Sequence, residues 1–161
     1  MGRYDMWIHG VSAVVEHPVE GMNVRHAGNG MILQQPAGSW NWVHITVPTP
    51  TIIDGDAEVA ATRIAFTADV NENARIKDVH VYMGGQHISA DSVDWSGTRL
   101  RRDSFLGEPF FDPFRDGIAA RAAPRIRHAD GPLTLCLRVE FLDGAETGEI
   151  CLTGAGAAFD T

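Results

Sequence analysis

Residues Val59–Met83, VAATRIAFTADVNENARIKDVHVYM, decide the fold class. Apolar side chains alternate with polar ones towards the end of Val59–Val70 and again over Ile76–Met83. Alternation with a period of two is typical of a β-strand, because successive side chains point to opposite faces. The Asn71-Glu72-Asn73 segment between them has the composition of a turn. We therefore predict two strands that run antiparallel on either side of this turn.

The same alternation recurs on both sides of this stretch, whereas long helical patterns are absent from the sequence. Proline cannot donate to a β-ladder, so Pro48 and Pro50 are expected to end a strand. We expect one or two strands over Met6–Glu16 with a bend at Gly10, strands at Met31–Gln35, Trp40–Val47 and His87–Trp95, and a glycine-rich loop at Gly21–Gly30 around a short Asn23–His26 segment.

Strands with one apolar face must bury that face against a second sheet. About eight to ten short strands therefore predict an all-β fold, an antiparallel β-sandwich or jelly roll, with a small closed β-barrel as the alternative. The chain has 161 residues, which suits one hydrophobic core. A single domain over residues 1–161 is predicted.

A hairpin is expected after residue 132. Leu133, Leu135, Leu137, Val139 and Phe141 share one strand face, and Asp143-Gly144 is a favoured two-residue turn. This register sets Leu137 opposite Ile150, Leu135 opposite Leu152, Arg138 opposite Glu149 and Cys136 opposite Cys151. We expect the two cysteines to be thiols on a sheet face, because no CxxC spacing indicates a metal site.

The segment Gly97–Pro132 is the least regular part of the sequence. It contains four phenylalanines, which must pack onto the sandwich edge, over a pocket or against another subunit. A short strand at Ile118–Ala123 is expected within it. The phenylalanines are Phe105, Phe110, Phe111 and Phe114, with Pro109 and Pro113 among them.

Acidic residues outnumber basic ones, and the formal net charge is −8 at pH 7. Nucleic-acid binders usually carry a basic face, so no nucleic-acid partner is predicted. The arginines between Arg99 and Arg127 are expected to form solvated ion pairs or a local basic patch. No apolar run approaches the roughly 18 residues of a membrane helix, so no membrane partner is predicted. Met1–Gly10 lacks the pattern of a signal peptide, and a cytoplasmic location is expected.

Three predicted strands each place an imidazole beside a large aromatic ring at positions i and i+2, which share a strand face. If these faces coincide, they form a surface or pocket of rings and imidazoles. The candidate ligand-binding residues are Trp7 and His9; Trp40, Trp42 and His44; and His80 and Tyr82.

Such a surface has three physical uses, besides the filling of a core or a subunit interface. Rings stack on sugars or other planar ligands while imidazoles bond their hydroxyls. Three histidines can bind a metal, although no spacing matches a metal motif and no cofactor is predicted. One histidine can act as an acid or base.

Other motifs carry weaker signals. Asp54-Gly55-Asp56 resembles part of a calcium loop but lacks the remaining ligands, so a turn is expected there. Gly154-Ala155-Gly156 is followed by no helix and does not predict a dinucleotide site. No spacing selects a catalytic pair among the carboxylates Asp91, Asp94, Glu108, Asp112 and Asp116.

Two stretches resemble a bacterial family of small β-sandwich proteins of unknown function. Trp7-Ile8-His9-Gly10 resembles the WIHG start of that family, and Trp40–Pro50 its NWFHIPIPTP-like central strand. Val79–Tyr82 matches a later segment, so the resemblance spans Met6 to Gly84. It implies the sandwich fold and no particular activity.

Three functions compete. The first is a protein that binds a small molecule, either a carbohydrate or another ligand with a ring. The second is a cyclase, isomerase or metal-dependent enzyme that uses His9, His44 and His80 under a phenylalanine-rich lid. The third is an assembly protein whose partner is a second copy of the chain in a homo-oligomer.

Overall fold

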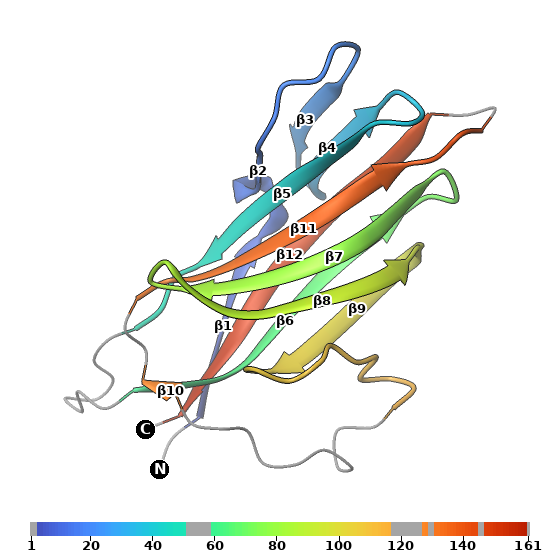
Figure 1. The fold of residues 1–161 in the computed structure, drawn as a ribbon. Coiled ribbons are helices and arrows are strands. Elements are labelled where there is room, and N and C mark those ends of the chain that lie inside the picture. Colours follow the sequence, from blue (N-terminus) through green and yellow to red (C-terminus); the bar gives the residue numbers. More distant parts are fainter. Residues whose placement is uncertain (1–2, 51–58, 117–126, 129–130, 145–146, 161) are drawn as a thin grey trace.

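The computed structural model describes residues 3–50, 59–116, 127–128, 131–144 and 147–160. They form two antiparallel sheets packed face to face (Figure 1). The prediction of an antiparallel β-sandwich is confirmed. The closed barrel is wrong, because no ladder joins the two sheets within the residues described.

Sheet A has seven strands and sheet B has five. Sheet A contains β1 (Arg3–His9), β3 (Asn23–Ala27), β4 (Gly30–Gln35), β6 (Ala60–Val70), β9 (Gly97–Phe105), β10 (Arg127–His128) and β12 (Gly148–Asp160). Sheet B has the order β2 (Val14–Val15), β5 (Trp40–Val47), β11 (Leu133–Phe141), β7 (Ala74–Met83) and β8 (Gln86–Trp95).

The bend expected at Gly10 is a single 3-10 turn, Gly10–Ser12, between β1 and β2. No helical segment of the described residues could cross a membrane. The glycine-rich region predicted as a loop contains β3, which pairs with β4. The turn at Gly28–Asn29 allows residues 23–27 to fold back onto residues 30–34.

The core lies between the sheets and comes from the alternation seen in the sequence. The inward face of β11 is fully buried, from Leu133 through Leu137 to Phe141, as predicted. It meets Ile64 and Phe66 of β6 and Ile150 and Leu152 of β12 in one cluster. The outward positions of β5, β11 and β7 remain available for a site.

The predicted hairpin of β11 and β12 is wrong. β11 pairs with β5 and β7 in sheet B, whereas β12 pairs with β1, β4 and β6 in sheet A. Both strands have one apolar face. These faces can be buried whether the two strands pair with each other or lie in two sheets that face each other. Cys136 and Cys151 are therefore not neighbours, and both are free thiols.

The strands around Asn71-Glu72-Asn73 also enter different sheets, so the predicted antiparallel pairing of β6 with β7 is wrong. Asn71 fixes this crossing: its side-chain oxygen accepts hydrogen bonds from the backbone N–H groups of Asn73 and Glu149. The turn residues were identified correctly, but turn chemistry alone does not distinguish a hairpin from a crossing between sheets.

Residues 97–105 form β9, so the expected irregularity of residues 97–132 is wrong for this part. Phe110 is buried against Phe66 and Trp95, with ring centroids 6.0 and 6.3 Å apart. Phe111 stacks on Phe105. Phe105, Phe110 and Phe111 therefore pack on the sandwich edge, whereas Phe114 is 79% exposed. The expected strand at residues 118–123 and the Asp54–Asp56 turn lie outside the described residues.

Candidate functional site

The structure divides the seven candidate residues between two sheets. Five of them lie on the outer face of sheet B, whereas the remaining two lie on β1 in sheet A. The five are Trp40, Trp42 and His44 on β5 and His80 and Tyr82 on β7; the two are Trp7 and His9.

Four rings on the outer face of sheet B contact one another. The His80 ring lies 4.8 Å from the ring of Trp42, 6.5 Å from that of Tyr82 and 5.3 Å from that of His87, measured between centroids. Tyr82 and His87 are 5.0 Å apart. We call Trp42, His80, Tyr82 and His87 the ring row.

His87 was not among the predicted site residues, although the sequence contained a signal for it. Gly84-Gly85 is a two-residue turn between β7 and β8, and the first pairs after it are Met83 with Gln86 and Tyr82 with His87. Counting outward from that turn would have placed His87 beside Tyr82.

A depression of about 270 Å³ lies against this row. Its lining adds Glu16, His44 and Cys136 to the rings of Trp42, His80 and Tyr82. Cys136 of β11 pairs with His44 on one side and His80 on the other. Because its side chain is short, the larger side chains on β5 and β7 stand on either side of a low point in the sheet.

Glu16 provides the carboxylate at the rim of the depression. Its Oε2 lies 3.7 Å from Nε2 of His44 and 3.2 Å from Nε2 of His17. The backbone N–H of Glu16 donates to the carbonyl of Trp42, which holds this residue beside β5. A ligand in the depression therefore meets a hydrogen-bond acceptor and imidazoles at one side.

The inner groups of the depression favour their uncharged forms. Burial lowers the pKa of His80, and the neighbouring His87 acts in the same direction, against a smaller opposing effect of Asp78. Burial, assisted by the charge of Glu16, raises the pKa of Cys136 to about 11. Cys136 is therefore a thiol near neutral pH and a poor nucleophile.

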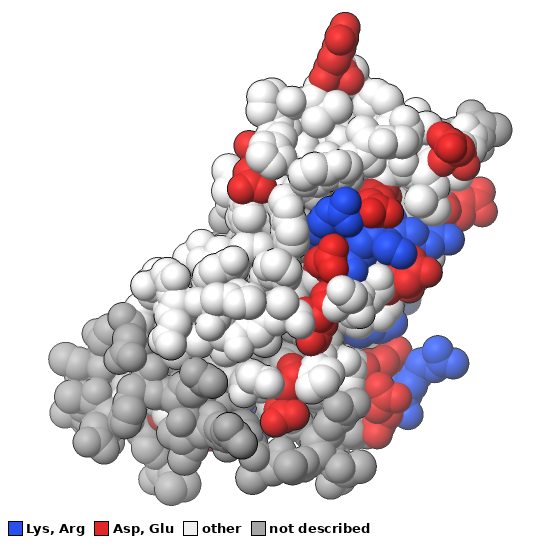
Figure 2. Space-filling model, viewed as in Figure 1, with Lys and Arg blue, Asp and Glu red and all other residues white. Residues whose placement is uncertain are grey.

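Trp40 marks the other end of the same face. The Arg138 guanidinium lies 4.9 Å from its ring centroid, and His17 approaches the ring edge-on. Arg138 also pairs with Glu140 at 2.7 Å and Asp78 at 3.4 Å. Figure 2 shows charged side chains gathered along one part of this side of the molecule and a broad uncharged area beside them. Trp40 thus belongs to a charged part of the face.

His9 has a local structural role. Its Nε2 lies 2.9 Å from the carbonyl oxygen of Gly28, and its Nδ1 accepts a hydrogen bond from the backbone N–H of Val11. Both ring nitrogens therefore contact backbone groups, Nδ1 in the 3-10 turn after β1 and Nε2 in the turn between β3 and β4. Trp7, by contrast, is 49% exposed and faces a separate pocket on sheet A.

No three His, Cys, Asp or Glu side chains converge as metal ligands among the residues that the structure describes. The chemistry of the depression on sheet B therefore consists of ring surfaces, imidazole nitrogens, one thiol and one carboxylate. Such groups suit stacking and hydrogen bonding to a small polar molecule.

Comparison with known proteins finds a matching family and several solved structures of low similarity. A model described as a family of unknown function, DUF6623, matches residues 1–128. No curated protein matches the chain. A structure of TmCBM61 with β-1,4-galactotriose is 12% identical, with a TM-score of 0.42 over 94% of this chain and 88% of that chain.

Two further solved structures have a similar degree of likeness. One, described by the words "CBM4 structure and function", is 14% identical with a TM-score of 0.46, over 97% of this chain and 93% of that chain. The family 11 carbohydrate-binding module of the Clostridium thermocellum cellulase Lic26A-Cel5E is 10% identical with a TM-score of 0.38, over 98% of this chain and 87% of that chain. Scores this low assign no ligand to this chain.

Proposed function

The chain belongs to DUF6623, a family of unknown function, and we propose that it binds small, neutral carbohydrates on the outer face of sheet B. The ring row carries this proposal: its four rings come from three strands and are connected by contacts through His80, and Trp42, His80 and Tyr82 line one depression. Their contacts form a continuous aromatic surface on the outside of the core.

A pyranose suits this site because its C–H groups match the aromatic rings and its hydroxyl groups match the polar side chains. The C–H groups on one face of the sugar can stack on an indole or phenol ring. Its hydroxyl groups can donate to Glu16 and exchange hydrogen bonds with His44. The volume of about 270 Å³ is just under the range of roughly 300–1,000 Å³ for drug-sized ligands. This size favours one or two sugar units.

The preference for a neutral ligand follows from the charges at the site. The lowered pKa of His80 and the raised pKa of Cys136 leave both groups uncharged near neutral pH. Glu16 then supplies a negative charge at the rim, which disfavours acidic sugars. Neutral hydroxyl donors meet no such penalty.

The test is a two-dimensional NMR titration with glucose, cellobiose, maltose and lactose. We expect at least one sugar to shift backbone signals of β5 and β7 saturably. Trp42→Ala should weaken that binding by about 30-fold, since a central aromatic contributes about 2 kcal/mol. Phe114→Ala is the matched control, because Phe114 is an exposed ring elsewhere on the molecule.

Two outcomes would contradict the proposal. In the first, none of the four sugars shifts signals of β5 or β7. In the second, Trp42→Ala and Phe114→Ala bind a sugar equally well. Circular dichroism of both variants would establish that each one is folded.

A further inference from the structure

A second pocket lies on the outer face of sheet A, across the sandwich from the ring row. It has a volume of about 250 Å³. Its floor consists of small residues of β6 and β12, including Ala65, Gly156 and Ala158. Asp5 and Trp7 of β1 line it together with Arg63 of β6 and Arg101 of β9. Its walls thus contain a ring, two guanidinium groups and a carboxylate.

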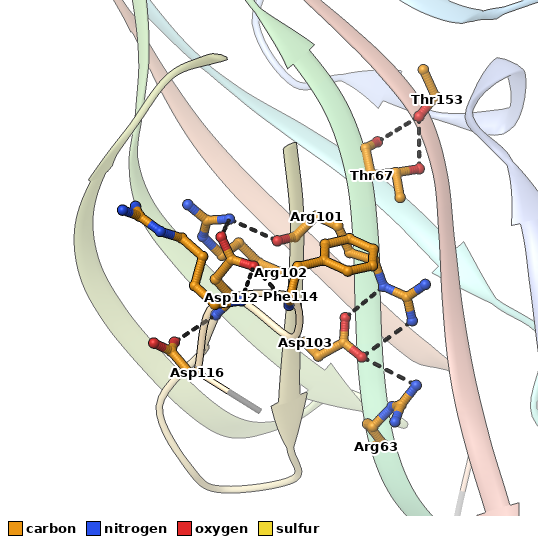
Figure 3. Close-up of polar contacts among 10 residues, drawn as sticks. Arg63, Thr67, Arg101, Arg102, Asp103, Asp112, Phe114, Asp116 and Thr153 are labelled. Carbon is orange, nitrogen blue, oxygen red and sulfur yellow. Dashed lines mark hydrogen bonds and ion pairs between the residues drawn. The ribbon is translucent and has the colours of Figure 1, made fainter. Parts of the chain in front are cut away.

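Both arginines are held by one buried carboxylate. Arg101 donates from Nε and Nη2 to the two oxygens of Asp103, at 2.9 and 3.2 Å. Arg63 Nη2 lies 3.1 Å from Asp103, whose side chain is 0% exposed. Figure 3 shows the two guanidinium groups on either side of this carboxylate. The trio carries a net charge of +1.

Most of the N–H groups on these two partly buried arginines have no hydrogen-bond partner among the described residues. A guanidinium has five N–H donors, and Arg101 gives two of them to Asp103. Within the described parts of the chain, neither Arg63 nor Arg101 has a side-chain hydrogen bond to any other residue. Their positions are fixed by a buried partner, so an anion entering the pocket meets ordered donors.

Trp7 is fixed just as firmly. Its ring lies directly on Gly156, where an added Cβ would come within 2.4 Å of Cδ2 of the indole. The Arg101 guanidinium lies 5.3 Å from the centroid of the same ring, within the range of a cation–π contact. The half-exposed indole therefore provides a flat surface beside the two arginines.

Asp5 supplies a negative charge at the same pocket, opposite to the charge of the two arginines. Its carboxylate pairs with Arg3 at 3.7 Å, and its side chain is about half exposed. A carboxylate on the ligand would be repelled there and attracted by the arginines, whereas a hydroxyl could donate to Asp5. The lining therefore orients a ligand that has an anionic end and a hydroxyl-bearing end.

We propose that this pocket binds a hydroxylated ring that carries a carboxylate, the chemistry of a uronic acid. The carboxylate of the ligand contacts Arg63 and Arg101, its ring lies against Trp7, and its hydroxyls face Asp5. This site is separate from the ring row and selects for an anionic ligand, whereas the ring row selects for a neutral one.

The experiment is an NMR titration with glucuronate, with glucose as the neutral ring and acetate as the carboxylate without a ring. We expect glucuronate to shift signals of β1, β9 and the Trp7 indole saturably. Glucose should leave these signals in place, and acetate should bind more weakly. Arg101→Gln should weaken glucuronate binding by at least about tenfold, the cost of a charged hydrogen bond.

A second variant covers the case in which Arg101→Gln fails to fold after losing its pair with Asp103. Trp7→Ala leaves the buried pair intact and should weaken glucuronate by about tenfold while leaving acetate unaffected. Arg25→Gln on β3 is the control, because it removes an exposed arginine of sheet A outside the pocket.

The proposal is overturned if glucuronate leaves β1 and β9 unshifted, if glucose shifts them as strongly, or if Trp7→Ala binds glucuronate like Arg25→Gln. Because the shifts of this site map to β1 and β9 and those of the ring row to β5 and β7, each proposal can fail without the other.

Discussion

The outer faces of the two sheets use the same kinds of residue in opposite ways. On sheet B, His80 of the ring row and the neighbouring Cys136 have pKa shifts that favour the neutral form. On sheet A, Trp7 lies beside two arginines that a buried carboxylate holds in place. An aromatic residue and a histidine at positions i and i+2 therefore indicate two side chains on the outward face of one strand. The residues of the neighbouring strands determine the chemistry of the surface that these side chains form.

The largest expected effect concerns the charges of sheet A. Asp103→Ala leaves Arg63 and Arg101 without their buried partner, and we expect it to lower the free energy of unfolding by about 3–5 kcal/mol. Asp94→Ala removes a mostly exposed carboxylate that pairs with Lys77 on sheet B, and should cost less than about 1 kcal/mol. Urea unfolding measures both. Equal losses would mean that the buried pair adds no stability beyond that of a surface pair.

The next effect concerns the floor beneath Trp7. Gly156→Ala places a methyl group against the indole, so the ring must move or the strands must separate. We expect a loss of about 1–3 kcal/mol, typical of overpacking, and a shifted tryptophan emission spectrum. Gly28→Ala is the matched control, since an added Cβ there meets nothing within 4 Å. An unchanged stability of Gly156→Ala would show that Trp7 does not depend on this contact.

On sheet B, the sharpest test is the reactivity of Cys136. Raising its pKa from 9.0 to about 11 lowers the thiolate fraction at neutral pH by about 100-fold. In a Cys151→Ser background, the native protein should react with a disulfide reagent at least about tenfold more slowly than the urea-unfolded protein, because the higher nucleophilicity of a high-pKa thiolate offsets part of its loss. Glu16→Gln should recover a minor part of the rate, because burial is the larger cause. Similar native and unfolded rates would contradict the burial of this thiol.

The smallest effect is the pH dependence of sheet B. Because the folded-state pKa of His80 is lowered from 6.5, the unfolded chain binds its proton at higher pH. Stability is therefore unaffected by His80 above that value and falls as the pH drops below it. The urea midpoint at about pH 5 relative to about pH 7.5 should fall less in His80→Gln than in the wild type. An equal fall in His80→Gln and in the wild type would contradict this prediction.

Local patterns predicted the strands better than their partners. The strands at residues 40–47 and 87–95 follow from alternation and turn residues, which are properties of adjacent positions. The pairing of β11 with β5 and β7 joins positions far apart in the chain, and alternation within a strand does not predict it. A regular strand was also missed at residues 97–105, where the phenylalanines and prolines that follow suggested an irregular segment.

In the candidate site too, local patterns predicted the residues of single strands but not which strands lie side by side. Trp42 and His44, and His80 and Tyr82, were grouped by spacing alone, and the structure places these pairs on one face. Cys136 enters between them because β11 lies between β5 and β7. Trp7 and Arg101 meet across β12 and β6, which no local pattern specifies. Residues of one strand are thus predictable as a set, whereas the composition of a pocket depends on strand order.

Residues 133–160 supply the central strand of sheet B and β12, a strand of sheet A that pairs with β1, β4 and β6. During synthesis these strands leave the ribosome after every other described strand. Until then β1 has no partner among the described strands, and β5 has only the two residues of β2. Sandwich closure is therefore a late event, preceded by a period in which unpaired edges are open to aggregation. A fragment ending at residue 128, where the family match ends, would lack both of these strands.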